Sequence, residues 1–156
     1  MIGIRFQIPN EYNNFLLKIF SHVDVMQYEW DIITDSSLEK DILTNKMKTS
    51  SGIFTSNKLT GEMFLKCISK NNYYMIFVDI KAFSKTGRHS CIFSFADFVN
   101  SDCQLIFLCT DSQFVTVFCK DMGVLKQISD NCLQFGFQNI NFIRYQDGNQ
   151  FEVIAF

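Results

Sequence analysis

Two apolar runs of strand length stand close together in the second half of the chain, CQLIFLC at residues 103–109 and QFVTVFC at residues 113–119. The three residues between them, Thr110-Asp111-Ser112, are the right length for a hairpin loop. In the second run the two valines and Cys119 fall on one face, and the residues between them fall on the other. The sequence therefore predicts a β-hairpin here, and the other elements are placed around it.

Three earlier stretches also predict strands. Residues 2–8 and 28–34 have the β-rich or alternating composition that is typical of strands. Residues 73–80, YYMIFVDI, form a nearly unbroken apolar run, as expected for a strand that is covered on both faces. This last stretch is the best candidate for the centre of the sheet.

Two helices are predicted between these strands. Asn10 can cap the first helix, and an apolar stripe at three-and-four spacing runs from Tyr12 to Val23. Thr60 can cap the second helix, whose apolar face extends to Ile68. Both patterns predict helices that bury one side.

The last third of the chain predicts two more helices and two more strands. Residues 94–97, SFAD, resemble a capping box at the start of a short helix. Asp121 can begin a longer helix, and Gly136 can end it. Residues 140–145 and 150–156 read as the last strands, with an Asp-Gly turn between them.

These elements together predict an α+β fold. The strand–helix–strand passage from residue 113 to residue 145 has the order of a right-handed crossover between parallel strands. We expect one domain over residues 1–156, with a mixed, mostly antiparallel sheet of about six to seven strands and three to four helices packed on it. Residues 38–60 show no sustained period, and only residues 53–55 suggest a short strand, so this segment either contains weak elements or is a functional loop.

Composition excludes several classes of function. Fourteen basic and sixteen acidic residues give a formal charge of −2, which argues against a domain that neutralises many phosphates of a nucleic acid. The N-terminal residues do not have the pattern of a signal peptide, and every apolar run is shorter than the roughly 18–20 residues that span a bilayer. We therefore expect a cytoplasmic protein with no nucleic-acid or membrane partner.

The six cysteines predict packing instead of chemistry. No two of them have the two-residue spacing of zinc knuckles or thioredoxin-like motifs, and a disulfide framework would require export. We expect free, buried thiols, with no metal and no cofactor. The cysteines are Cys67, Cys91, Cys103, Cys109, Cys119 and Cys132.

One group of residues is a candidate ligand site. Lys81, Arg88 and His89 follow the predicted central strand, at the place where open α/β sheets hold ligands, and they could bind an anion. No phosphate-loop motif accompanies them, so a solvated basic loop is the simpler interpretation. Asp79, inside the apolar strand, either has Lys81 or backbone amides as partners, lies on an exposed face, or serves as a site carboxylate.

Other chemistry-bearing residues carry weaker signals. His89 and Cys91 are close enough in sequence for a thiol and its base, but no orienting Asn or Asp can be identified, so a loop histidine and a packing cysteine are the simpler interpretation. Glu29 and Asp31 could form an acid/base pair on one face of a strand, or simply be the polar face of that strand. His22, at the predicted end of the first helix, needs no catalytic role. The catalytic residues, if there are any, stay unassigned.

Three stretches of the chain resemble a known family. MIGIRFQIPNEY at the start, YYMIFVDIKAF in the middle and NSDCQLIFLCTDSQFVTVFCKD at residues 100–121 are similar to a domain-of-unknown-function family of small proteins, found chiefly in Gram-positive spore-forming bacteria. The resemblance implies a bacterial, cytosolic origin. It implies no activity, ligand or catalytic residue.

Two hypotheses of function follow. The first is a non-enzymatic, cytosolic protein-interaction module, regulatory or immunity-like, because the residues form no recognisable catalytic set. The alternative is a small protein or enzyme that binds an anionic ligand with the strand end and loop at residues 79–91.

Overall fold

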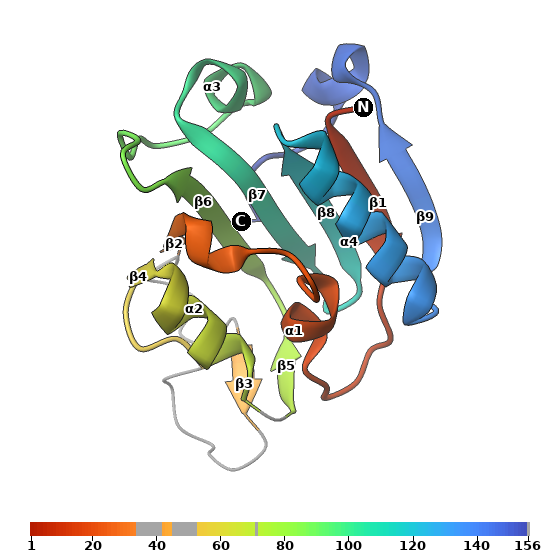
Figure 1. The fold of residues 1–156 in the computed structure, drawn as a ribbon. Coiled ribbons are helices and arrows are strands. Elements are labelled where there is room, and N and C mark those ends of the chain that lie inside the picture. Colours follow the sequence, from red (N-terminus) through yellow and green to blue (C-terminus); the bar gives the residue numbers. More distant parts are fainter. Residues whose placement is uncertain (34–41, 45–52, 71, 156) are drawn as a thin grey trace.

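The structure is a computed structural model, and it describes residues 1–33, 42–44, 53–70 and 72–155. A seven-stranded sheet, in the order β4-β2-β6-β7-β8-β1-β9, organises these residues (Figure 1). Every pair of neighbouring strands described in this sheet is antiparallel. Its strands are β1 (Gly3–Gln7), β2 (Tyr28–Ile33), β4 (Lys58–Thr60), β6 (Val78–Ser84), β7 (Cys103–Thr110), β8 (Phe114–Cys119) and β9 (Gln138–Ile143). A second sheet pairs β3 (Ile42–Thr44) with β5 (Tyr73–Met75).

The predicted hairpin lies at the middle of the large sheet. Strands β7 and β8 pair in antiparallel register up to Thr110 and Phe114, which leaves a loop of three residues. Asp111 and Ser112 in this loop have φ values of 49° and 64°, a left-handed conformation that short polar side chains tolerate. The short loop and the two apolar runs therefore specify the central strand pair, as the sequence predicts.

The passage from β8 through α4 (Met122–Gln134) to β9 is the predicted strand–helix–strand unit. Strand β1 lies between β8 and β9 and is antiparallel to both. β8 and β9 therefore run parallel to each other without pairing directly. The predicted parallel orientation of the two strands is present, but β8 and β9 are not neighbours in the sheet, because β1 lies between them.

Helices cover the two faces of the sheet unequally. Figure 1 shows α1 (Phe15–Ile19), α2 (Gly61–Ile68) and α4 on one face, which we call the first face. Its core is aromatic: the rings of Trp30 and Phe64 stack with centroids 3.8 Å apart. The second face carries the short helix α3 (Phe95–Asn100), the 3-10 helix η2 (Tyr145–Gln150) and the residues that follow η2. A further 3-10 helix, η1 (Val25–Gln27), precedes β2.

Several helix ends follow the predicted capping. The Thr60 side chain accepts a hydrogen bond from the Met63 amide at 3.2 Å, and Ser94 and Asp97 form the complete capping box. Asp121 accepts hydrogen bonds from the first amides of α4, and Gly136 follows that helix with φ at 69°. These contacts are local in sequence, which is why the sequence reveals them.

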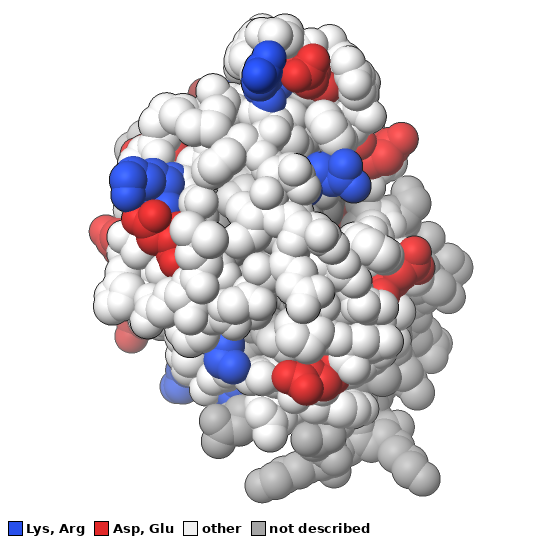
Figure 2. Space-filling view, turned by 90° about the vertical axis from the view of Figure 1, so that its right-hand side faces the viewer, with Lys and Arg blue, Asp and Glu red and all other residues white. Residues whose placement is uncertain are grey.

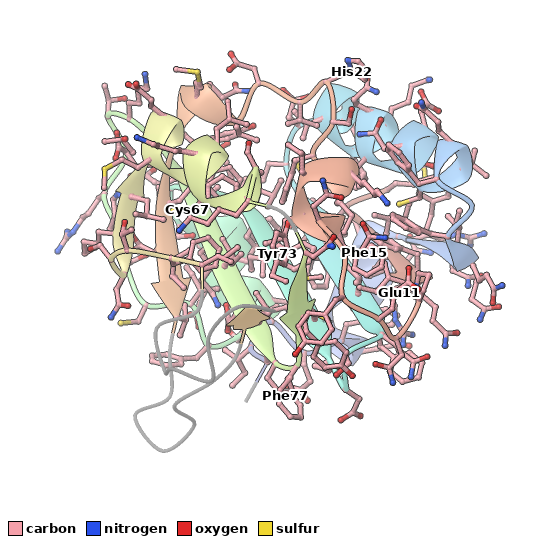
Figure 3. The ribbon with its side chains drawn as sticks, turned by 90° about the horizontal axis from the view of Figure 1, so that it is seen from below. Glu11, Phe15, His22, Cys67, Tyr73 and Phe77 are labelled. Carbon is pink, nitrogen blue, oxygen red and sulfur yellow. The ribbon has the colours of Figure 1, made fainter. Side chains whose placement is uncertain are left out.

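The apolar run at residues 73–80 is not one strand. It breaks at Ile76-Phe77 into β5 and β6, which belong to different sheets. The Tyr73 hydroxyl accepts a hydrogen bond from the Leu16 amide at 3.0 Å and donates to the Ile68 carbonyl at 3.2 Å, and this holds β5 close to α1 and α2 (Figure 3). β6 then continues to Ser84, so Lys81 lies in the strand and not in the predicted basic loop.

The first helix is much shorter than its apolar stripe predicts. It begins at Phe15, not after Asn10, because Asn13 forms a β-bridge with Tyr73 and its amide donates to the Tyr73 carbonyl at 3.0 Å. An extended residue at position 13 is incompatible with helical geometry there. Phe15, Leu16, Ile19 and Phe20 are nevertheless buried, as predicted, whereas Tyr12 is 40% exposed and Val23 is only partly buried.

Two predicted strands are absent at their expected places. Residues 53–55 are irregular, and the edge strand beside β2, on the side away from β6, is β4 at Lys58–Thr60. Residues 145–150 form η2, and residues 151–155 cross the second face without strand pairing. Gly148 of η2 packs directly against the Phe95 ring, a contact across more than fifty residues that the Asp-Gly turn signal does not anticipate.

In the described part of the chain, none of the helices is long and apolar enough to cross a membrane.

Candidate functional site around His89

His89 lies on the segment that leaves β6 and turns back over the second face of the sheet. The Gly87 amide donates to the Ser84 carbonyl at 2.9 Å, and the Arg88 amide donates to Asp102 at 2.8 Å. These two bonds fix the direction of the returning chain. The imidazole of His89 consequently stacks on Phe83, with ring centroids 4.3 Å apart and planes 19° from parallel.

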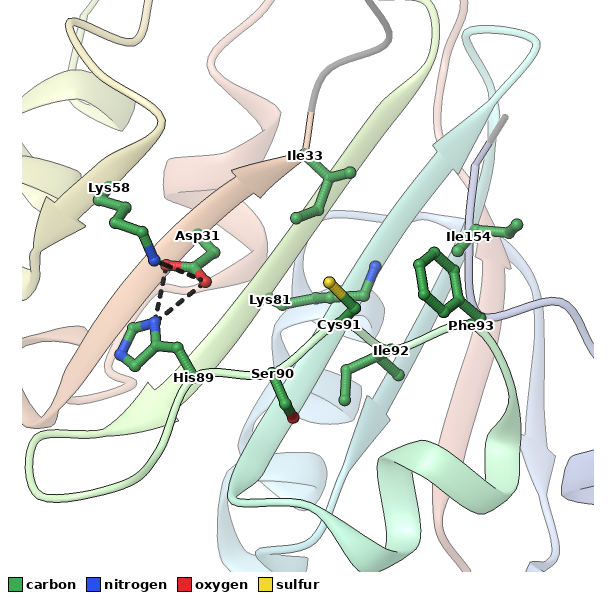
Figure 4. Close-up of a pocket in the computed structure, with 10 residues that line it drawn as sticks. All are labelled: Asp31, Ile33, Lys58, Lys81, His89, Ser90, Cys91, Ile92, Phe93 and Ile154. Atoms are coloured by element: carbon green, nitrogen blue, oxygen red, sulfur yellow. Dashed lines mark hydrogen bonds and ion pairs between the residues drawn. The ribbon is translucent and has the colours of Figure 1, made fainter.

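Asp31 orients this imidazole. The Nδ1 atom of His89 lies 2.9 and 3.0 Å from the two carboxylate oxygens of Asp31, and the Lys58 ammonium lies 3.4 Å from the same carboxylate (Figure 4). Because an ionised carboxylate only accepts hydrogen bonds, Nδ1 carries the proton. In the neutral ring, Nε2 is then the atom with a free lone pair.

The oriented ring borders a hollow of about 250 Å³, which we call the His89 hollow. One part of its wall is polar and the other is apolar, as Figure 4 shows. The lining residues are Asp31, Ile33, Lys58, Lys81, His89, Ser90, Cys91, Ile92, Phe93 and Ile154. His89 also lines two adjoining, more open hollows, so its ring stands where three depressions meet.

Asp79 and Lys81 form a buried ion pair on β6. Both side chains are almost wholly shielded from solvent, and the second carboxylate oxygen of Asp79 accepts a hydrogen bond from the Ala155 amide at 3.2 Å. Burial raises the pKa of Asp79 above its ordinary value, and the Lys81 charge and the hydrogen bonds oppose that shift. The expected partners of Asp79, Lys81 and a backbone amide, are therefore both present.

The four residues of the predicted ligand site are only partly brought together. Lys81 and His89 line the His89 hollow. Arg88 lines a neighbouring hollow with Asp97 and Asp102. Asp79 lies beneath the surface under Ala155 and is not among the residues that line the His89 hollow. Ligand binding by these four residues stays a prediction.

The cysteines pack, with one exception. Cys67, Cys103, Cys109, Cys119 and Cys132 are buried, whereas Cys91 is exposed at the His89 hollow. Burial raises the pKa of Cys103, Cys109, Cys119 and Cys132 to about 12, so these four remain protonated thiols at neutral pH. Figure 4 shows no hydrogen bond between the Cys91 thiol and the His89 ring. The described residues contain no group of three His, Cys, Asp or Glu side chains that could hold a metal ion.

Sequence reasoning missed the partner of His89. The sequence indicates Asp31 only as a carboxylate paired with Glu29 or as part of a polar strand face, and it identifies no orienting acid for His89. The structure supplies that acid from a strand 58 residues earlier in the chain. Glu29 lies on the same strand two residues before Asp31 and borders an adjoining hollow. No sequence signal connects positions 31 and 89, because their contact depends on the pairing of β2 with β6.

A second candidate site is a surface that has no charged side chains. Residues 131–143, NCLQFGFQNINFI, contain no Lys, Arg, His, Asp or Glu and run from the end of α4 into the edge strand β9. Leu133 is 66% exposed and Phe142 is 47% exposed. Figure 2 shows that this side of the molecule is largely uncharged, with acidic and basic groups around it. We call the exposed part of residues 131–143 the uncharged surface.

Comparison with known proteins places the chain in a family. The model of the DUF2691 family, described as a protein of unknown function, matches residues 1–153. The "Uncharacterized protein YncE" of Bacillus subtilis strain 168 is 30% identical over 141 residues, which cover 90% of each chain. No solved structure matches significantly. The resemblance read from the strand sequences is thereby confirmed: the chain belongs to the DUF2691 family of proteins of unknown function.

Proposed function

We propose that the protein is a protein-interaction module and that it binds its partner through the uncharged surface, by adding an extended strand of the partner beside β9. The observation that carries this proposal is the edge strand itself. Gln138–Ile143 has one paired side, towards β1, and contains neither a charged residue nor a proline. Proteins usually protect such an edge with charges, prolines or bulges, because its free amide and carbonyl groups attract other strands.

The two halves of β9 differ in how they are protected. A register shift against β1 occurs between Arg5 and Gln7, and Asn139 has φ at 54°, so the first half is bulged. The Asn141 side chain also donates to the Asn139 carbonyl at 2.8 Å. The second half, from Asn141 to Ile143, keeps regular pairing with β1 and has an outer edge suitable for a partner strand.

Exposed apolar side chains supply contact area beside this edge. Phe142 is on β9, and Leu133 and Phe135 are at the end of α4. Aromatic side chains are enriched at protein interfaces, and charged side chains are depleted at interface cores. The composition of the uncharged surface is therefore that of an interface core with its polar rim.

Affinity capture with matched variants tests the proposal. The tagged protein is used to capture partners from cells that naturally produce it, beside the double variant Asn141→Lys/Phe142→Lys. Leu65→Lys is the control, because Leu65 is also an exposed apolar residue but lies on α2. We expect one protein to be recovered in stoichiometric amount by the parent and the Leu65→Lys variant, and lost from the double variant. Recovery of the parent alone, or equal recovery by all three, would contradict the proposal.

A second candidate function is the binding of a small anion in the His89 hollow. The observation that favours it is the orientation of His89 by Asp31, since a protonated imidazole held in this way can donate from Nε2 to a ligand. Each cation that lines the hollow already lies beside a carboxylate, either Asp31 or Asp79, so the hollow has little excess positive charge. For this reason we rank it second.

Thermal unfolding with added anions tests the second candidate. Phosphate, sulfate and nucleotides are titrated. A bound anion at a concentration of 100 times its dissociation constant should raise the free energy of unfolding by about 2.7 kcal/mol. The effect should disappear in His89→Ala and persist in Arg88→Ala, which changes only the neighbouring hollow. Absence of stabilisation by every anion would remove this candidate.

A further inference from the structure

The charged pair on β6 lies beneath an unusual cover. Asp79 and Lys81 point to the second face of the sheet, where their cross-strand neighbours include Leu108 and Ile106. The segment Phe151–Ala155 covers Asp79 and Lys81 on this face, and its Val153 and Ala155 side chains are buried. A pair of opposite charges is thus placed under a piece of chain that belongs to no helix or strand.

That segment is held by few bonds. The Phe151 amide donates to the Gly148 carbonyl at 3.2 Å, and the Ala155 amide donates to Asp79 at 3.2 Å. Among the described residues, positions 152–155 make no backbone–backbone hydrogen bond. The Arg5 guanidinium also lies over the Phe151 ring, 5.2 Å from its centroid. Segments with so few bonds open at much lower free energy than the sheet beneath them.

Hollows flank the segment on both sides. Ile154 lines the His89 hollow on one side and, on the other, an open hollow of about 640 Å³ whose wall includes Arg5, Leu108 and Thr116. Removing the segment would join the two hollows into one groove across β2, β6, β7, β8 and β1. Asp79 and Lys81 would then lie on the floor of that groove and regain water.

We propose that Phe151–Ala155 is a displaceable strap that occupies, within its own chain, a groove built for an extended polypeptide. The occupant we assign is a partner segment with the chemistry of the strap: small apolar side chains at alternate positions, as at Val153 and Ala155, and a backbone amide that donates to Asp79. The strap itself already lies there with these contacts: Val153 and Ala155 are buried, and the Ala155 amide donates to Asp79. Burying Asp79 and Lys81 has a desolvation cost, which lowers the free energy needed to release the strap. This groove is on a different surface from β9, so the inference does not depend on the proposed function.

Hydrogen exchange on the intact protein gives the first test. The Ala155 amide should exchange at least 100 times faster than the amides of β7, because it should open without unfolding of the sheet. Equal protection of Ala155 and β7 would show that the segment opens only with global unfolding, and would overturn the proposal.

Exchange of the strap in trans gives the second test. A protease site is inserted between Asn149 and Gln150, both exposed, and the protein is folded before it is cut. A labelled peptide of residues 150–155 should then replace the cut segment. The same peptide N-methylated at Ala155, in which a methyl group replaces the hydrogen donated to Asp79, should bind about tenfold more weakly or worse, whereas a Glu152→Gln peptide should bind equally. Unfolding of the cut protein, failure of the labelled peptide to bind, or equal binding by the N-methylated peptide would each overturn the proposal.

Discussion

Asp79 and Lys81 illustrate how two neighbouring residues can control stability from inside a sheet. Each is buried, and each is the other's partner. We expect Asp79→Asn to lower the free energy of unfolding by about 3–5 kcal/mol, because it leaves the Lys81 charge buried and unpaired. The double variant Asp79→Leu/Lys81→Met should lose much less, since it removes both charges. Urea denaturation measures the difference, and a double variant as unstable as the sum of its single changes would contradict the expectation.

The exposure of Cys91 predicts a simple thiol count. An aromatic disulfide reagent should react quickly with one thiol per folded molecule and with six in denaturant, because the other five are buried. Cys91→Ser should abolish the fast reaction. More than one fast thiol in the folded parent would show that the sheet interior is more accessible than the structure indicates.

The bond between His89 and Asp31 predicts an unusual tautomer. In the neutral ring the proton should be on Nδ1, and nitrogen NMR of the imidazole distinguishes this from the Nε2 form. Asp31→Ala should release the ring to the Nε2-protonated form. An Nε2 proton in the parent would mean that the neutral ring does not donate to Asp31.

At the scale of elements, the contact between η2 and α3 depends on a glycine. A Cβ atom at Gly148 would lie 2.2 Å from the nearest atom of the Phe95 ring, closer than carbon atoms can approach. We expect Gly148→Ala to lower the free energy of unfolding by about 1–3 kcal/mol through overpacking. Gly123→Ala is the control: that glycine is in the first turn of α4 and its Cβ would meet only the Asp121 carboxylate at 3.1 Å, so the change should be within about 1 kcal/mol. Equal effects of the two substitutions would argue against the packing of η2 on α3.

For the whole molecule, one sheet is shared by two cores. Trp30 is buried in the core of the first face, and Cys103 is buried in the core of the second. Because β6, β7 and β8 contribute side chains to both cores, we expect both to unfold together. Trp30 fluorescence, far-UV circular dichroism and the reactivity of Cys103 should report one coincident transition. Separate transitions would mean that one face can open without the other.

What could be predicted from the sequence is what neighbouring residues decide among themselves. The hairpin of β7 and β8, the capping box at Ser94 and the limits of α4 at Asp121 and Gly136 each depend on contacts within a few positions. Alternation of apolar residues also identified which side chains are buried. The α+β class followed from these local patterns, but β4 and the irregular course of residues 151–155 did not.

The rest was decided by contacts between distant parts of the chain. The pairing of Asn13 with Tyr73 shortened α1, and the packing of Gly148 on Phe95 replaced a predicted turn with η2. Asp31 reaches His89 only because β2 pairs with β6. The sequence by itself determined the elements with a local signature and the apolar faces to be buried. Only the tertiary structure decided which polar groups meet. Hydrogen bonds and ion pairs act over a few ångströms, and no local sequence pattern indicates which distant positions come that close in the folded protein.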